Sequence, residues 1–308
     1  MRHLVAIVGP TASGKTELAR QLALRCDGEI ISADSRQVYR GMDIGTAKAD
    51  TAPVPQHLVD IIPPSDPFSL GDWLDHARET LADIWSRGRL PFVVGGTGQY
   101  VWALLEGWQV PRVPAQPQLR VELERRALRE GVEALAAELR ERDPQAAARV
   151  DARNPRRVIR ALEVLAATGQ AAPECAVRQS PDWQTMVIGL SLPRDELYRR
   201  IDQRVDAMVD AGLEDEVRGL LEHGYHPDLP AMSGIGYRQI CQHLAGELDL
   251  ATAIEHIKTE THRFVRHQNN WFKPSDPRIH WLAFDANPLA AASALLRDFV
   301  RIEEPVIR

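Results

Sequence analysis

A short glycine-rich stretch near the N-terminus restricts the possible folds of this chain more than any other feature of the sequence. The residues that match the phosphate-loop pattern G-x-x-x-x-G-K-[ST] are Gly9, Pro10, Thr11, Ala12, Ser13, Gly14, Lys15 and Thr16. The apolar run at residues 4–8 predicts a buried strand before the stretch, and Leu18 and Leu22 recur behind it at helical spacing. A strand, a phosphate loop and a helix in this order are the context that the pattern requires. The sequence therefore predicts a phosphate or pyrophosphate site where that helix begins.

The predicted loop suits a polyanion through both its backbone and its side chains. Its glycines let backbone N–H groups turn toward phosphate oxygens, and the beginning of a helix adds a partial positive charge. We expect Lys15 to neutralise the anion and the hydroxyl of Thr16 to bind Mg²⁺. ATP hydrolysis does not follow, because NTPases also hold Mg²⁺ with an acidic residue at the end of a neighbouring buried strand. The clearest such strand, at residues 90–94, runs into Gly95 and Gly96 instead, which disfavours ordinary phosphoryl transfer.

Asp34 follows the second predicted strand, at residues 29–33. The carboxyl ends of strands in an open parallel sheet point at the ligand crevice, so Asp34 is expected to face the phosphate site. A carboxylate beside a bound polyanion is unfavourable unless it binds a metal or accepts a proton. Local pattern alone leaves a helix cap, a metal ligand and a general base equally open for Asp34.

The order of predicted elements indicates an α/β fold, a P-loop NTPase-like parallel sheet flanked by helices. Prolines punctuate the chain from about residue 111, and charge-dense helical stretches follow. A strand-like run at residues 186–192 resumes the sheet, and a long amphipathic helix comes after it with Leu197, Ile201, Val205, Met208 and Val209 on one face. We expect a core domain of residues 1–115 and 185–308, interrupted by an all-helical insertion of residues 116–184.

Composition limits the partners and the compartment. The 308 residues are 44% hydrophobic, enough for a substantial core, and the net charge of −6 means that an RNA site must be a local basic patch. No apolar run reaches the length of a membrane span and no signal peptide precedes the first strand, so we expect a cytoplasmic protein. Cys26, Cys175 and Cys241 lie far apart without a Cys-x-x-Cys pair, which favours reduced thiols over a disulfide or zinc site.

The densest basic run is a candidate RNA-binding segment within the predicted insertion. It comprises Arg153, Arg156, Arg157 and Arg160. Helical spacing also brings Glu163 near Arg160, so a solvated helix face with ion pairs remains an alternative. In the carboxyl half, Arg204 and Arg218 are two candidates, of which one or both could reach a pyrophosphate, and surface ion pairs with nearby carboxylates are as compatible with their spacing.

Several segments together resemble the bacterial tRNA dimethylallyltransferases, also called tRNA isopentenyltransferases. The matching segments are residues 9–16 (GPTASGKT), 32–48 (SADSRQVYRGMDIGTAK), 94–100 (VGGTGQY), 154–164 (NPRRVIRALEV), 234–239 (GIGYRQ) and the closing helix that ends near Trp271-Phe272. They run over nearly the whole chain in the family's order. The second and fourth segments are more specific than the phosphate loop, because nucleotide kinases lack them.

This resemblance implies a Mg²⁺-dependent transfer of a dimethylallyl group from dimethylallyl pyrophosphate to N6 of the adenosine immediately 3′ of the anticodon in tRNA. It implies that residues 9–16 hold the donor pyrophosphate, that Asp34 is the general base, and that Thr97 lies with Lys15 where donor and tRNA meet. The tRNA contacts it implies are Asp34, Ser35, Arg36, Gln37, Thr97, Arg120, Arg156, Arg157, Val158, Ile159, Arg160, Ser233, Gly234, Ile235, Gly236, Tyr237 and Arg238. The expected partner is an anticodon stem-loop, bound by a monomer.

The closing helix departs from the family pattern. His262 and His267 stand at positions that are usually basic in the family, and Arg266 keeps its charge. Histidine is mostly neutral at pH 7, so these two positions are expected to contribute less to RNA affinity. The aromatic pair Trp271 and Phe272 is interpreted as core packing rather than base stacking.

Three alternatives remain at this stage. An isopentenyltransferase that acts on free AMP or ADP would share the phosphate loop and Asp34, but would have little need of the insertion. A small-molecule or nucleotide kinase would need a site for the γ-phosphate of ATP and a second acceptor pocket, and the missing acid at the strand end after Val94 and the family-specific segments count against it. A non-catalytic RNA-binding protein would be expected to have lost Asp34 or Lys15, and both are present.

Overall fold

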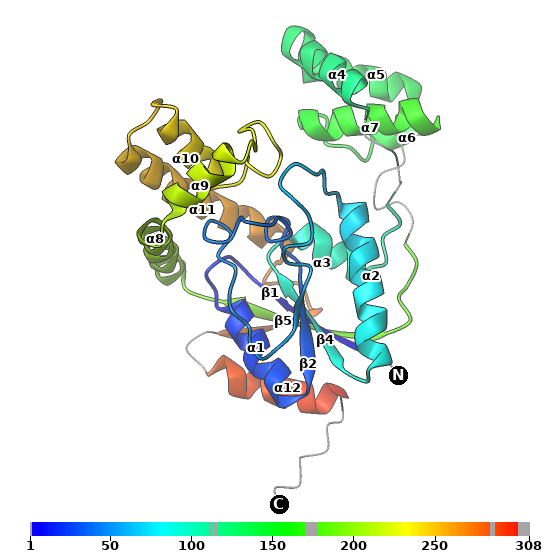
Figure 1. Ribbon diagram of the computed structural model, residues 1–308. Helices are drawn as coiled ribbons and strands as arrows, with labels where there is room; N and C mark the ends of the chain where they lie inside the picture. The colour runs from blue at the N-terminus through cyan, green and yellow to red at the C-terminus, as the bar shows by residue number, and fades with distance from the viewer. Residues whose placement is uncertain (1, 111–112, 114–115, 170–177, 284–286, 301–308) are drawn as a thin grey trace, which may run out of the picture. The chain divides into compact units, whose positions relative to one another are not determined.

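The computed structural model describes residues 2–110, 113, 116–169, 178–283 and 287–300, and it divides into two compact units (Figure 1). The larger unit contains residues 1–105 and 181–308, and the smaller contains residues 106–180. Both divisions fall earlier in the chain than the predicted boundaries. The reason is that the two connecting segments pair with each other: the N–H of Gln179 donates to the carbonyl of Gly107 over 2.9 Å, and Arg178 contacts Glu106 at 3.1 Å. Both segments therefore belong to the smaller unit.

A parallel six-stranded sheet forms the centre of the larger unit. Its strand order is β3-β2-β4-β1-β5-β6. The strands are β1 (His3–Val8), β2 (Gly28–Ser32), β3 (Gln56–His57), β4 (Leu90–Gly95), β5 (Gln184–Ser191) and β6 (Ile279–Ala283). Four of these were predicted, and the α/β class is confirmed. The two edge strands, β3 and β6, were not, because β3 is two residues long and neither forms a continuous apolar run.

Helices cover both faces of this sheet (Figure 1). On one face, α1 (Lys15–Arg25) and α12 (Pro288–Val300) share a core with inward side chains such as Ile7 and Phe92. On the other face lie α2 (Leu70–Ser86) and α3 (Gly98–Leu105). The buried indole of Trp73 on α2 donates to the carbonyl of Ser32 over 3.0 Å, which fixes α2 against the end of β2.

Four further helices follow the fifth strand: α8 (Arg194–Asp210), α9 (Leu213–Glu222), α10 (Tyr237–Leu244) and α11 (Leu250–Trp271). They share a second core with residues of the loop after β2, including Val38 and Met42. The predicted amphipathic face of α8 is confirmed, since Leu197, Ile201 and Val205 are buried. This packing brings the helices of the carboxyl half to the loops at the carboxyl ends of β1, β2 and β4.

Within its described residues, the regular secondary structure of the smaller unit consists of helices. Its helices are α4 (Pro117–Glu130), α5 (Val132–Arg142), α6 (Pro144–Ala147) and α7 (Pro155–Thr168). Local signals delimit α7: the side chain of Asn154 accepts from the N–H of Arg157, Pro155 occupies the first turn, and Gly169 ends the helix at φ 74°. Leu123, Leu139 and Leu162 lie in the core that these helices share.

A buried carboxylate at the amino-terminal end of β2 joins this strand to β3. Glu29 on β2 is fully buried and accepts hydrogen bonds from Arg87, from Arg89 over 2.7 Å, and from His57 on β3 over 2.6 Å. These contacts, above all the hydrogen bond from Arg87, lower the pKa of Glu29 from 4.5 to about 2. The cluster lies at the edge of the sheet opposite to the phosphate loop, so its contribution is to stability.

Replacing Glu29 with Gln is expected to lower the free energy of unfolding near neutral pH by about 3 kcal/mol, the low end for breaking a buried ion pair, because Arg87 and Arg89 remain partly in water. The folded-state pKa lies below the ordinary one. The carboxylate therefore stabilises the fold above pH 4.5, and this stabilisation is lost as the pH falls to about 2. Urea unfolding between pH 2 and 7 measures both effects, and an unchanged pH dependence in Glu29→Gln would contradict the assignment.

Candidate functional site

The phosphate loop has the backbone geometry that anion binding requires. Gly9 has φ 143° and a Cβ there would lie 2.7 Å from the carbonyl oxygen of Leu190, so only glycine fits. Gly14 has φ 88° and immediately precedes α1. The hydroxyl of Ser13 is buried and has no hydrogen-bond partner among the described residues. A bound phosphate oxygen would satisfy such an orphaned donor.

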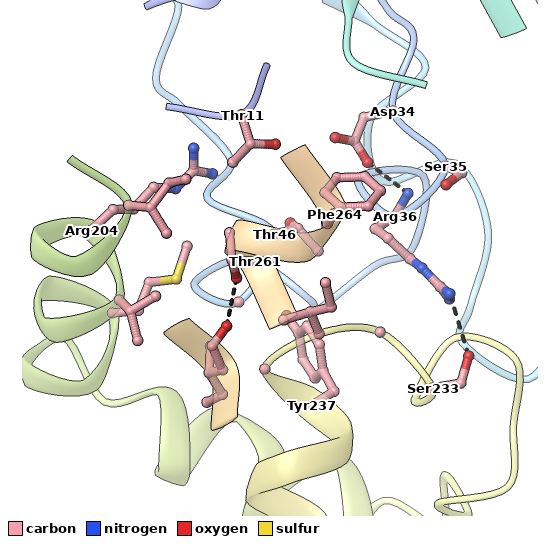
Figure 2. Close-up of a pocket in the computed structure, with 18 of the residues that line it drawn as sticks. Thr11, Asp34, Ser35, Arg36, Thr46, Arg204, Ser233, Tyr237, Thr261 and Phe264 are labelled. Atoms are coloured by element: carbon pink, nitrogen blue, oxygen red, sulfur yellow. Dashed lines mark hydrogen bonds between the residues drawn. The ribbon is translucent and has the colours of Figure 1, made fainter. Parts of the chain in front are cut away.

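A cavity of about 300 Å³ lies beside this loop, within the larger unit (Figure 2). Its polar wall includes Thr11, Asp34, Thr97 and Arg204, which come from four separate segments of the chain. The rest of the polar wall comes from the loop after β2, from the segment that leads into α10, and from Thr261 and Gln268 of α11. The structure thus brings together three of the sequence segments that were singled out, residues 9–16, 32–48 and 94–100, with the segment at 233–238.

Asp34 and Thr97 are held side by side by the backbone. The N–H of Thr97 donates to the carbonyl of Ala33 over 3.2 Å, and the Thr97 hydroxyl accepts from the N–H of Ser35 over 3.2 Å. One carboxylate oxygen of Asp34 accepts from the N–H of Arg36 over 2.8 Å. Asp34 caps no helix, which removes one of the three interpretations left open. Its other oxygen has no hydrogen bond within the described residues and is available to a ligand.

Two cations stand near this carboxylate. Lys15 donates to the carbonyl of Pro10 over 2.6 Å, and burial lowers its pKa from 10.5 to about 7, with the charge of Arg204 acting in the same direction and Asp34 opposing both. The guanidinium of Arg204 has no ion pair among the described residues, and its burial lowers its pKa. Two cations kept together with little compensation form a site for a polyanion.

Gln268 joins the phosphate loop to the loop after β4. Its side-chain oxygen accepts from the N–H of Thr11 over 2.8 Å, and its amide donates to the carbonyl of Gly96 over 3.1 Å. A Cβ at Gly96 would lie 2.1 Å from the Gln268 amide nitrogen, so any other residue at this position would displace the Gln268 side chain. One buried side chain of α11 therefore fixes the distance between the loop at residues 9–16 and Thr97.

The remaining wall of the cavity is apolar. Ile201, Val205 and Met208 of α8 flank Arg204 at helical spacing, and Ile257 of α11 also lines this wall. Phe264 of α11 also lines the cavity and remains 41% exposed, so its ring is accessible to a ligand (Figure 2). The cavity therefore combines a cationic end with walls that suit a short hydrocarbon and an aromatic ring.

The donor set is compatible with a magnesium ion that is bound mainly by its substrate. Thr16 offers a hydroxyl at the first turn of α1, and the described residues contain no cluster of three or more histidine, cysteine or acidic side chains. Mg²⁺ commonly keeps several waters and binds through few protein ligands together with substrate phosphates. The residues present fit that arrangement. They do not fit a metal held by the protein alone.

In the smaller unit, the arginines of the predicted RNA-binding segment fall into two groups: some are exposed, and others form ion pairs with a buried carboxylate. Arg156 and Arg157 are exposed and form no ion pair within the described residues. Arg160 contacts the buried Glu163 at 3.5 Å, the ion pair predicted from spacing, and Arg120 forms a bidentate pair with the same carboxylate over 2.8 and 2.6 Å. These two arginines therefore compensate a buried charge.

Val158 and Ile159 require a correction. Both were included among the RNA contacts, but their side chains are 0% and 6% exposed in the core shared by α4, α5 and α7. The pattern of a helix explains this, since residues 158, 159, 162 and 165 lie on the face opposite to the exposed arginines. Their side chains orient the helix and are not available to RNA.

The segment at residues 233–238 contributes to the cavity through Ser233, Gly234, Ile235, Gly236 and Tyr237. Arg36 crosses to this segment and donates to the carbonyl of Ala231 over 3.3 Å and to the hydroxyl of Ser233 over 3.3 Å (Figure 2).

The other members of these two segments lie outside the cavity. The side-chain oxygen of Gln37 accepts a hydrogen bond from the hydroxyl of Ser32, and its amide donates to the carbonyl of Thr46. Arg238 forms an ion pair with Glu260 at the surface.

Other residues that the sequence left open now have positions. Arg218 pairs with Glu214 over 2.6 Å on the surface, so of the two candidate arginines only Arg204 reaches the cavity. His262 stacks on Tyr198 with ring centroids 4.0 Å apart and contacts Asp202 at 2.9 Å, outside the cavity. Phe272 is a core residue as interpreted, whereas Trp271 is 36% exposed and packs over Gly98.

Sequence reasoning missed the apolar wall, Gln268 and Phe264. The apolar wall has a sequence signal, because the pattern places Ile201, Val205 and Met208 on one face of a helix. The pattern does not say whether such a face lines a core or a cavity. Phe264 and Gln268 lie in the closing helix, where the family resemblance concerns the basic positions and gives no role to these two.

None of the described helices is long and apolar enough to span a membrane.

Comparisons with known proteins agree with this geometry. The sequence model of the IPP transferase family matches residues 37–275, and that of isopentenyl transferase matches residues 2–57. The tRNA dimethylallyltransferase of Roseiflexus sp. (strain RS-1) is 53% identical over 299 residues, which cover 96% of this chain and 98% of that protein.

Solved structures are similar over the whole chain. The tRNA isopentenylpyrophosphate transferase from Bacillus halodurans has a TM-score of 0.71 at 41% identity, and the match covers 98% of this chain and 96% of that one. A eukaryotic dimethylallyltransferase acting on tRNA has a TM-score of 0.84 at 25% identity, with coverage of 100% and 81%.

Proposed function

The chain belongs to the IPP transferase family, and from that premise we propose that it transfers a dimethylallyl group from dimethylallyl pyrophosphate to N6 of the adenosine immediately 3′ of the anticodon in tRNA. The observation that carries the proposal is the cavity itself. Asp34 and Arg204 line it together with apolar side chains of α8 and α11, and Lys15 of the phosphate loop lies close enough to both charged groups to interact with them. Each part corresponds to one requirement of the reaction.

The cationic end of the cavity suits the pyrophosphate of the donor. In this proposal the backbone N–H groups of residues 9–16, the ammonium of Lys15 and the guanidinium of Arg204 bind the same anion. As the C1–O bond of the donor breaks, negative charge grows on the departing pyrophosphate, and groups already oriented toward it stabilise the transition state more than the ground state. When bound, Mg²⁺ adds further charge stabilisation on the pyrophosphate, with Thr16 as its proposed protein ligand.

The apolar wall suits the five-carbon chain of the donor. Ile201, Val205 and Met208 lie on the same face of α8 as Arg204, so a pyrophosphate held by Arg204 leaves its hydrocarbon beside them. A wall without polar side chains also keeps water away from the allylic carbon, where it would compete with the amine. The ring of Phe264 is available for a nucleobase.

Asp34 is the proposed general base. A new bond forms between C1 of the donor and N6 of adenine while the C1–O bond breaks, and the amine must lose one proton in the process. The free carboxylate oxygen of Asp34 is oriented by the contact of its partner oxygen with the N–H of Arg36. The Thr97 hydroxyl, held by the N–H of Ser35, lies on the same side of the cavity and is proposed to position the adenine.

The smaller unit supplies the proposed contacts to the RNA backbone. Arg156 and Arg157 lie in the first turn of α7 and are exposed without an ion pair among the described residues, whereas the exposed Arg153 pairs with Asp151 at 3.4 Å. Removing both with Ala is expected to weaken stem-loop affinity about tenfold and to reduce the slope of log K against log[salt] by about 1.5, since each lost phosphate contact removes 0.7 to 0.9. Fluorescence anisotropy over a series of salt concentrations measures both quantities.

The matched control is Arg129→Ala with Arg142→Ala, which removes the same charge from the same unit at residues that pair with Glu130 and Glu138. This variant is expected to keep the wild-type slope. Equal slopes for both double variants would show that net charge, rather than contact by Arg156 and Arg157, governs the binding. The two arginines would then be interpreted as part of a solvated helix face.

The experiment that tests the function is transfer of label from dimethylallyl pyrophosphate, with Mg²⁺, to a synthetic anticodon stem-loop and, in parallel, to AMP, ADP and ATP. Label is expected only in the stem-loop, and not in a stem-loop with inosine at the target position, because inosine lacks the amine. Label in a free nucleotide would favour the alternative transferase. Consumption of ATP without transfer would favour a kinase. We further propose that the chain acts as a monomer in the cytoplasm.

A further inference from the structure

One carboxylate outside the cavity holds two of its walls together. Glu216 on α9 accepts hydrogen bonds at one oxygen from the N–H groups of Asp43, over 2.8 Å, and Ile44, over 2.7 Å. Its other oxygen accepts from the N–H of Gly45 over 3.1 Å and from the hydroxyl of Tyr237 over 2.6 Å. Four donors therefore converge on one carboxylate, and charge-assisted hydrogen bonds of this kind are about twice as strong as neutral ones.

The four donors belong to two segments that are far apart in sequence. Residues 43–45 continue the loop that begins with Asp34, and Tyr237 begins α10 directly after the segment at 233–236. Gly45 and Tyr237 both line the cavity, whereas Glu216 does not. The two walls are in close contact, because a Cβ on Gly45 would lie 2.5 Å from the ring of Tyr237. The position of each wall thus depends on the other.

The backbone of residues 43–45 also has a specific need for this carboxylate. Three successive N–H groups that point in one direction form an anion-binding concavity, and each of them requires an acceptor where water is excluded. Glu216 is the acceptor for all three in the described structure. At the far end of the same loop, Arg36 bonds the segment at 230–233, so the loop is held to the carboxyl half at both ends.

We propose that Glu216 is a positioning residue for the acceptor nucleotide. It acts through Gly45 and Tyr237, and it sets the wall that the adenine meets relative to Asp34. The donor end of the cavity, formed by residues 9–16 and Arg204, has no contact with Glu216 among the interactions described, so donor binding is independent of it. This inference rests on the proposed transfer to an adenine of RNA.

The test is Glu216→Gln, which keeps the shape of the side chain but turns an NH₂ group toward backbone donors. We expect KM for the stem-loop to rise about tenfold and kcat to fall, because a hydrogen-bonded charge is lost, while the Kd of dimethylallyl pyrophosphate stays within about twofold of wild type. Glu216→Asp, which keeps the charge with a shorter reach, is expected to recover part of the loss. Tyr237→Phe, which removes one donor of four, is expected to change KM in the same direction by less.

Glu214→Gln is the matched control, since Glu214 lies on the same helix and its carboxylate pairs with Arg218 at the surface. It is expected to behave as wild type. All variants are assayed well below their melting temperatures. If Glu216→Gln is unfolded at the assay temperature, Glu216→Asp and Tyr237→Phe are compared with wild type instead. A parallel weakening of donor Kd and stem-loop KM, or no change in either, would overturn the inference. Failure of the wild-type protein to label the stem-loop would instead overturn the proposed function.

Discussion

Asp34→Asn is expected to reduce single-turnover transfer to the stem-loop by about 10³-fold, within the range for loss of a general base. Binding of dimethylallyl pyrophosphate should persist, because Asp34 acts on the amine of the acceptor and not on the pyrophosphate. Removing a negative charge near Lys15 and Arg204 even favours an anionic ligand, so donor Kd is expected to stay equal or to fall slightly. Rapid-quench transfer and equilibrium donor binding measure the two quantities separately.

The Asn side chain keeps an oxygen that can accept from the N–H of Arg36, so the loop conformation is retained. Asp66→Asn, an exposed change in a later loop, is the control for loss of one carboxylate and is expected to have wild-type activity. Near-wild-type turnover by Asp34→Asn would remove the general-base assignment. Loss of donor binding together with turnover would instead indicate that Asp34 serves the donor, as a metal ligand does.

Lys15→Ala is expected to lower kcat/KM for the donor by about 10³-fold, and Arg204→Ala by about 10²-fold, the range for removing an electrostatic contact to a charge that develops in the transition state. Both KM and kcat should change, because the two cations contact the pyrophosphate before and during bond breaking. The double variant is expected to lose less than the product of the single effects, since both groups act on one anion.

Arg218→Ala provides the control for the second of these variants. It lies one helix further along the chain, carries the same charge and pairs with Glu214 on the surface, so it is expected to keep wild-type kinetics. Steady-state assays with varied dimethylallyl pyrophosphate at saturating stem-loop distinguish the four proteins. Unchanged donor kinetics in Lys15→Ala would remove the phosphate loop from the mechanism, and equal effects of Arg204→Ala and Arg218→Ala would show a general effect of charge.

The parts of the site that could be predicted from sequence are those fixed by local structure. A phosphate loop lies within one strand, turn and helix, so its pattern alone defined Lys15 and Thr16. Asp34 followed from a general property of parallel sheets, because the end of β2 lies at the same edge as the end of β1. These residues need no knowledge of distant contacts.

Arg204, Gln268 and Glu216 depend on contacts between elements far apart in sequence. Arg204 occupies a position on an amphipathic helix where a surface ion pair was equally plausible, and Arg218 does form one. Glu216 interacts with residues that precede it by more than 170 positions. No local pattern reports such pairings, since they are set by how α8 to α11 pack on the loops of the sheet.

The error at Val158 and Ile159 has the opposite origin. The family resemblance implies RNA contacts for all of residues 156–160, whereas a helix divides its residues between two faces. The side chains of Val158 and Ile159 lie on the buried face. The apolar character of these two residues already contained the information. Burial of the helical unit's core also explains why Arg120 and Arg160 serve the buried Glu163.

The most direct test of the central claim is a crystal structure of this chain with an unreactive analogue of dimethylallyl pyrophosphate, Mg²⁺ and an anticodon stem-loop. The account predicts that the pyrophosphate lies between residues 9–16 and Arg204, that the hydrocarbon contacts Ile201 and Val205, and that N6 of the target adenine is within hydrogen-bond distance of the Asp34 carboxylate. An adenine that enters this cavity with its amine turned away from Asp34, or a donor bound elsewhere, would contradict it.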